Sequence, residues 1–117
     1  MFPIGREAVN YPSRMEHFTE SGQHDDFKAW VADHEKRGYV ICWDNDPNNL
    51  AGTRLHAASC GMLNHAVVDP PNYTKSCSTR LVDLADYWRD KHGGVRLGQA
   101  CEVNGDCHLL AKRLEQI

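Results

Sequence analysis

The sequence predicts an α+β fold, with a small antiparallel sheet of about three strands and helices packed on one face. One supporting observation is a helix–glycine–strand unit, in which the amphipathic segment His24 to Arg37 is followed by Gly38 and the apolar run Tyr39 to Trp43. The other is the order of elements along the chain: helix, strand, strand, strand, helix, helix. This order favours antiparallel pairing of the strands beneath a helical layer.

Residues 1–20 show no clear periodicity and contain Pro3, Gly5 and Pro12, so we expect an irregular N-terminal arm. Residues 21–117 show no linker or internal repeat, and we expect them to form one α+β domain.

The predicted helix over residues 24–37 has one apolar face. Phe27, Trp30 and Val31 recur with the spacing of a 3.6-residue period. Acidic residues in the first turn and basic residues in the last turn complement the helix dipole. Gly38 suits the left-handed position that follows a helix.

Three strands are expected next. Residues 39–43 are apolar on both faces, which indicates a central strand. Residues 53–59 alternate weakly and complete a hairpin, and residues 73–77 form the third strand. Between the first two, Asp44-x-Asp46-x-Asn48 resembles the start of a calcium loop, but Asn49 stands where glycine is required, so a polar turn is favoured.

Two helices close the chain. Ser78 is a plausible N-cap for a helix that ends near Gly93. Its apolar face repeats the spacing of the first helix and consists of Leu81, Leu84, Ala85 and Trp88. The final helix, over residues 107–116, is capped by Asp106 and buries Leu110 and Leu114.

Composition limits the functional classes. The 117 residues carry a net charge of −3, which argues against a generally basic nucleic-acid binder but leaves a local basic face open. No apolar run has the length of a signal-peptide core or of the roughly 18 residues that span a membrane, so a cytoplasmic protein without membrane association is expected. In that compartment, five cysteines indicate core thiols or metal ligands more than disulfides.

Four cysteines fall at or near the ends of predicted elements and form the candidate zinc site: Cys60, Cys77, Cys101 and Cys107. Candidate substitute ligands are the histidines His56, His65 and His108. The alternative interpretation treats the cysteines as small buried apolar residues, as is expected of Cys42 within its strand. A redox role finds little support, since the chain has no C-x-x-C pair.

A basic set surrounds the second and third strands. Arg54, His56 and Lys75 are expected on one sheet face, with Arg80 in the first turn of the following helix. Such a face can hold phosphates, and Trp43 or Tyr73 could stack on a base. The first functional hypothesis is therefore a zinc-stabilised binding module that engages nucleic acid or a partner protein through this strand face.

Two other classes remain open. Asn64 and His65, followed by Asp69 and Asn72, match part of a one-metal nuclease site, which makes a metal-dependent nuclease or hydrolase using His56 or His65 an alternative. The other is a phage or bacterial regulator that acts through protein–protein contacts alone. No hydrolase, phosphate-loop or dinucleotide motif is present, so a non-enzymatic role is favoured and no catalytic residue is assigned.

Three segments share a further pattern. Residues 38–41 read Gly-Tyr-Val-Ile, residues 55–60 read Leu-His-x-Ala-x-Cys, and residues 73–77 read Tyr-x-Lys-x-Cys. In these segments the chain resembles a small uncharacterised bacterial domain, over roughly residues 24 to 108. The resemblance implies that His56, Cys60, Lys75 and Cys77 belong to one site or one core, and it implies no established activity.

Overall fold

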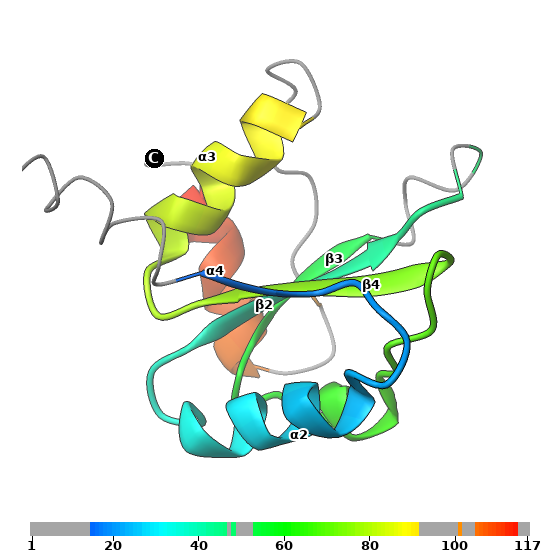
Figure 1. Cartoon of the computed structure of the whole chain (residues 1–117). Helices are drawn as coiled ribbons and strands as arrows, with labels where there is room; N and C mark the ends of the chain where they lie inside the picture. The colour runs from blue at the N-terminus through cyan, green and yellow to red at the C-terminus, as the bar shows by residue number, and fades with distance from the viewer. Residues whose placement is uncertain (1–14, 47, 49–52, 92–100, 102–104, 115–117) are drawn as a thin grey trace, which may run out of the picture.

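The structure is a computed structural model that describes residues 15–46, 48, 53–91, 101 and 105–114 (Figure 1). At its centre lies an antiparallel sheet of four strands in the order β1-β4-β2-β3. The strands are β1 (Glu16–Phe18), β2 (Tyr39–Asp44), β3 (Arg54–Ala57) and β4 (Tyr73–Ser78). The α+β class and the antiparallel sheet are therefore confirmed, with one strand more than expected.

The additional strand is β1, which lies within the segment predicted to be an irregular arm. It pairs with β4, so that Phe18 stands opposite Lys75. The remainder of that predicted arm, residues 1–14, lies outside the described residues.

Helices lie on both faces of the sheet, whereas the sequence predicted them on one. Figure 1 shows α2 (His24–Asp33) below the sheet and α3 (Leu81–Lys91) above it, while α4 (Gly105–Leu114) runs past the sheet, from its start below the strands to its end above them. The short 3-10 helix η3 (Gly61–His65) lies on the side of α2. The cause is β2, whose neighbouring residues Val40 and Ile41 are both fully buried and point to opposite faces. Both faces of the sheet therefore need an apolar cover.

Each face has its own core. The side chains between the sheet and α3 and α4 include Ile41, Trp43, Leu55, Leu84, Trp88 and Leu110. Those between the sheet and α2 and η3 include Phe18, Phe27, Trp30, Val40, Leu63 and Cys77. The cysteines Cys60, Cys101 and Cys107 belong to this second core.

The predicted element boundaries hold with small changes. Helix α2 ends at Asp33, and the chain continues in turns in which the Arg37 amide donates to the His34 carbonyl at 3.0 Å. Position 38 favours glycine because the site has no room for a side chain, and not because the backbone is left-handed. A Cβ there would come within 2.9 Å of Trp30 Cη2. Ser78 lies before α3, and its Oγ accepts the Arg80 amide at 3.0 Å.

Candidate metal centre

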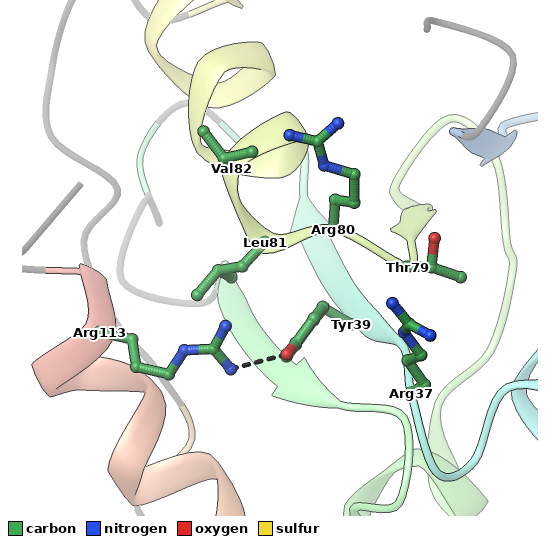
Figure 2. A pocket seen from close by; sticks show the side chains of 7 residues that line it. All are labelled: Arg37, Tyr39, Thr79, Arg80, Leu81, Val82 and Arg113. Atoms are coloured by element: carbon green, nitrogen blue, oxygen red, sulfur yellow. Dashed lines mark hydrogen bonds between the residues drawn. The ribbon is translucent and has the colours of Figure 1, made fainter. Parts of the chain in front are cut away.

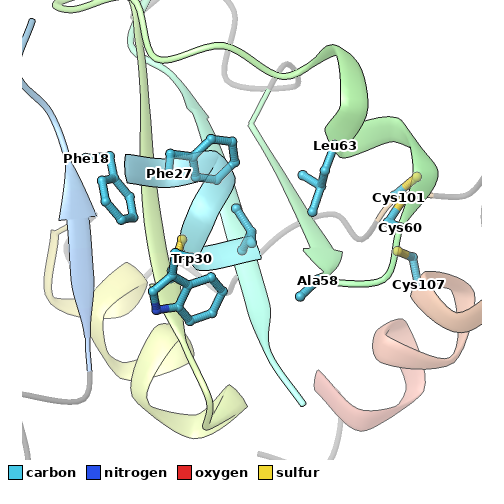
Figure 3. Packing of buried hydrophobic residues seen from close by; sticks show 10 residues of the cluster. Phe18, Phe27, Trp30, Ala58, Cys60, Leu63, Cys101 and Cys107 are labelled. Atoms are coloured by element: carbon cyan, nitrogen blue, oxygen red, sulfur yellow. The ribbon is translucent and has the colours of Figure 1, made fainter. Parts of the chain in front are cut away.

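A cluster of metal-binding side chains lies where the end of β3, the start of η3 and the first turn of α4 meet. Figure 3 shows Cys60, Cys101 and Cys107 together at one end of the core beneath the sheet. His56 joins them, and the four ligand atoms all lie within 4.8 Å of one another. All four residues are buried. One imidazole and three thiols form a ligand set that could coordinate a metal ion.

The backbone brings these side chains together through β3. The Cys60 amide donates to the Ala57 carbonyl at 2.9 Å, which closes the turn between His56 and Cys60. The Cys101 amide donates to the Leu55 carbonyl at 2.9 Å. Three of the four ligands are thus fixed relative to one four-residue strand.

The fourth ligand, Cys107, reaches the same strand through its sulfur. Its Sγ accepts a hydrogen bond from the Ala57 amide at 3.2 Å. Because β3 is an edge strand, Leu55 and Ala57 would otherwise present unpaired backbone groups there. The cysteines cover this edge, and an amide–sulfur hydrogen bond is the kind of outer contact that orients a thiolate ligand.

His56 has the protonation state that a metal ligand needs. Burial, followed by the positive charges of Arg54 and Lys75, lowers the pKa of His56 to about 4, so the imidazole is neutral at pH 7. Its Nδ1 is buried and has no hydrogen-bond partner among the described residues. A buried polar atom without a partner is unfavourable, and an ion bound at this nitrogen would satisfy it.

The thiol of Cys107 is held in its protonated form when no ion is present. Burial raises the pKa of Cys107 to about 12, against the opposing effect of the Ala57 amide. A hydrogen bond with Cys60 and the nearby thiols of Cys60 and Cys101 contribute to this rise. A divalent cation would displace the proton, because its charge stabilises the thiolate.

Three of the four predicted cysteines lie in this cluster, and Cys77 does not. In the sheet register, Cys77 is opposite Val40, and Val40 is opposite His56. Two strand spacings, roughly 10 Å, therefore separate Cys77 from His56. Cys77 is instead fully buried in the core between the sheet and α2, where burial raises its pKa.

The remaining sulfur and histidine candidates also lie apart from the cluster. His65 is exposed on η3, and the side chain of His108 lies outside the described residues. Cys42 is half-buried against the same core, and burial raises its pKa to about 11. His56 is therefore the substitute ligand that the structure brings to the three cysteines.

The residues predicted to bind nucleic acid do not share one exposed face. Trp43 is 4% exposed and its ring stacks on Trp88 with centroids 5.0 Å apart, on the sheet face opposite to Lys75. Lys75 is 3% exposed, and its Nζ donates to the Val67 carbonyl at 2.6 Å. Burial also lowers the pKa of Lys75. Arg54 is half-buried, His56 lies in the cluster, and Arg80 is exposed.

In the segment that resembles the start of a calcium loop, the aspartate side chains accept hydrogen bonds from nearby backbone amides. Asp44 Oδ1 accepts the Asp46 amide at 3.1 Å, and Asp46 Oδ1 accepts the Asn48 amide at 2.9 Å. These contacts are those of Asx turns, as the polar-turn interpretation expects.

No helix in the described ranges is long and apolar enough to span a membrane. Comparison with protein-family models, curated proteins and solved structures finds no significant match for this chain. The cluster of His56 with three cysteines is therefore the observation from which a function has to be argued.

Proposed function

We propose that the chain is a small binding module stabilised by one structural zinc ion, with His56, Cys60, Cys101 and Cys107 as its ligands. The observation that supports this is the buried convergence of four ligand atoms. Thiolates favour zinc over the harder cations, and an imidazole completes a common zinc ligand set. Four protein ligands leave no open position for water or substrate, which is typical of a structural site.

A metal ion at this point would join parts of the chain that are far apart in the sequence. The ligands come from positions 56 to 107, so one ion would join the edge of the sheet, η3 and the start of α4. Helix α4 has only ten residues, and Leu109 on it is 57% exposed. Small domains with limited cores commonly gain stability from such ions.

The nuclease or hydrolase alternative has less support. A catalytic zinc ion keeps an open position, whereas His56 lies in a set of four protein ligands. His65, the other histidine of that alternative, is exposed and is not part of the cluster.

A protein-interaction role is a second candidate, supported by a separate observation. Met62, Val67 and Tyr73 are exposed and line one cavity of about 320 Å³ beside Lys75. In pull-down experiments, a specific partner should bind the wild-type chain and be lost with Val67→Asp, with no effect of added nucleic acid. Retention of the partner by Val67→Asp would reject this surface.

Native mass spectrometry with and without a chelator tests the zinc proposal. One zinc ion per chain is expected before chelation and none after it. His56→Ala and Cys107→Ala should lower the occupancy, while Cys42→Ala is the matched control and should keep one ion. Cys77→Ala should also keep the ion, and loss of zinc in that variant alone would return Cys77 to the ligand set in place of His56.

A further inference from the structure

A second candidate site lies on the opposite side of the sheet, in a positively charged pocket. Figure 2 shows it beside Tyr39 of β2, at the start of α3 and the last turn of α4. The cavity has a volume of about 510 Å³ and is lined by Arg37, Arg80 and Arg113. Among the residues that the structure describes, no carboxylate lines it. Three arginines at one point are notable in a chain whose net charge is −3.

The arginines come from three different parts of the fold. Arg113 donates from Nη1 to the Tyr39 hydroxyl at 2.6 Å, and its guanidinium lies 5.3 Å from the centroid of the Tyr39 ring. These contacts hold the Arg113 side chain at the pocket. Arg37 approaches Tyr39 from the other side, is exposed, and has no carboxylate partner within the described residues (Figure 2). Arg80 is exposed at the start of α3.

We infer that this pocket binds a phosphate monoester. Guanidinium groups recognise phosphate through paired, charge-assisted hydrogen bonds, and Thr79 adds a hydroxyl to the lining. Leu81 supplies an apolar wall for the group that carries the phosphate. The volume falls within the range of small-ligand sites.

The pocket suits a single phosphate group better than a nucleic-acid strand. Binding of a single strand requires aromatic rings that are free to stack on successive bases. At this pocket, the face of Tyr39 is covered by Arg113, and Trp43 is stacked on Trp88 in the core. The ligand class is therefore a phosphate monoester, whether the ester is a mononucleotide or a phosphorylated side chain.

The pocket is linked to the metal centre through α4, and this part of the inference rests on the proposed function. Cys107 and Arg113 lie on the same helix, six residues or about 9 Å apart along its axis. Tyr39 is opposite Ala57 in the sheet, and the Ala57 amide binds Cys107 Sγ. An ion that fixes the start of α4 would therefore also fix Arg113 beside Tyr39. Removing the ion should weaken phosphate binding.

The test is a titration of the full zinc-loaded chain with phosphate-containing probes. Binding is monitored by arginine-selective NMR and by calorimetry. The probes are inorganic phosphate, adenosine 5′-monophosphate and a phosphoserine peptide, each ester with its unphosphorylated parent, and a single-stranded RNA. At least one phosphate ester should bind at least tenfold more tightly than its parent. Arg37→Gln and Arg113→Gln should each weaken binding at least tenfold, with circular dichroism showing an unchanged fold. Arg89→Gln, which removes a charge from α3 at a residue paired with Asp86, is the matched control and should bind as the wild type does.

Several outcomes would overturn the inference. The first is that the phosphate esters bind no more tightly than their unphosphorylated parents. The second is that Arg89→Gln loses as much binding as Arg37→Gln and Arg113→Gln. The third is that RNA binds but no monoester does. The zinc content, measured in the same samples, separates the two proposals. Zinc without ester binding rejects the phosphate pocket alone. Arginine-dependent ester binding without zinc supports the pocket and rejects the structural zinc ion and its link to Arg113.

Discussion

Removal of the metal should lower the thermal stability of the chain by a large and calculable amount. A ligand that binds only the folded state stabilises it by RT ln(1 + [L]/Kd), which is about 4.1 kcal/mol when free zinc exceeds Kd about 1,000-fold. For 117 residues the unfolding entropy near the midpoint is about 0.25 kcal/mol/K. The melting temperature should therefore fall by roughly 16 °C when zinc is removed.

The structure also indicates where the loss should begin. All four candidate ligands are buried around β3 and the first turn of α4, so metal-free protein should lose protection there first. The assay is differential scanning calorimetry with zinc and with chelator, together with amide hydrogen exchange. Cys60→Ser should melt at one temperature in both conditions, while Cys42→Ser should keep the full difference. A wild-type difference of less than about 2 °C would refute the reasoning, since the ion would then contribute too little to count as structural.

Three further predictions address the ligands and the packing. His56→Cys should keep one zinc ion, because four thiolates also form a tetrahedral site. His56→Ala should weaken zinc binding by at least about 100-fold, measured in competition with a chromophoric chelator. Equal zinc affinities of His56→Ala and the wild type would exclude the imidazole as a ligand. Because burial raises the Cys107 pKa to about 12, its proton competes with zinc throughout the neutral range, so the apparent affinity should rise at least about tenfold per pH unit between about pH 6 and 8. The His56 proton should compete only near pH 4, and an affinity that does not change with pH would contradict thiolate ligation. Gly38→Ala should lower the unfolding free energy in urea by about 1–3 kcal/mol, because its Cβ would lie 2.9 Å from Trp30 Cη2, while Gly61→Ala, with no atom within 4 Å of its Cβ, should change it little.

Local pattern was sufficient to predict most elements of this fold. The strand expected over residues 39–43 is β2 (Tyr39–Asp44), and the helix expected after Ser78 is α3 (Leu81–Lys91). Strand β1 could not be found in this way because its three residues have no alternation of their own and depend on pairing with β4. The placement of helices on both faces follows from the burial of Val40 and Ile41 on opposite sides of β2.

The sequence predicted that cysteines would form the candidate metal site, but it did not identify all four of the residues that meet there. Cysteines near the ends of elements indicated a metal site, and three of the four lie in the cluster. The choice between Cys77 and His56 depends on the strand order β4-β2-β3, which places β2 between them and which no local pattern specifies. Of the three pocket arginines, the sequence indicated only Arg80 as a phosphate-binding residue. Arg37, Arg80 and Arg113 are far apart in the chain and meet only through the packing of three elements.

X-ray absorption at the zinc edge of the purified chain tests the central claim most directly. Zinc held by His56, Cys60, Cys101 and Cys107 should give a first shell of three sulfur atoms at about 2.3 Å and one nitrogen atom at about 2.0 Å. A shell of oxygen and nitrogen atoms alone, or one of four sulfur atoms in the wild-type chain, would contradict the ligand set on which the proposed function depends.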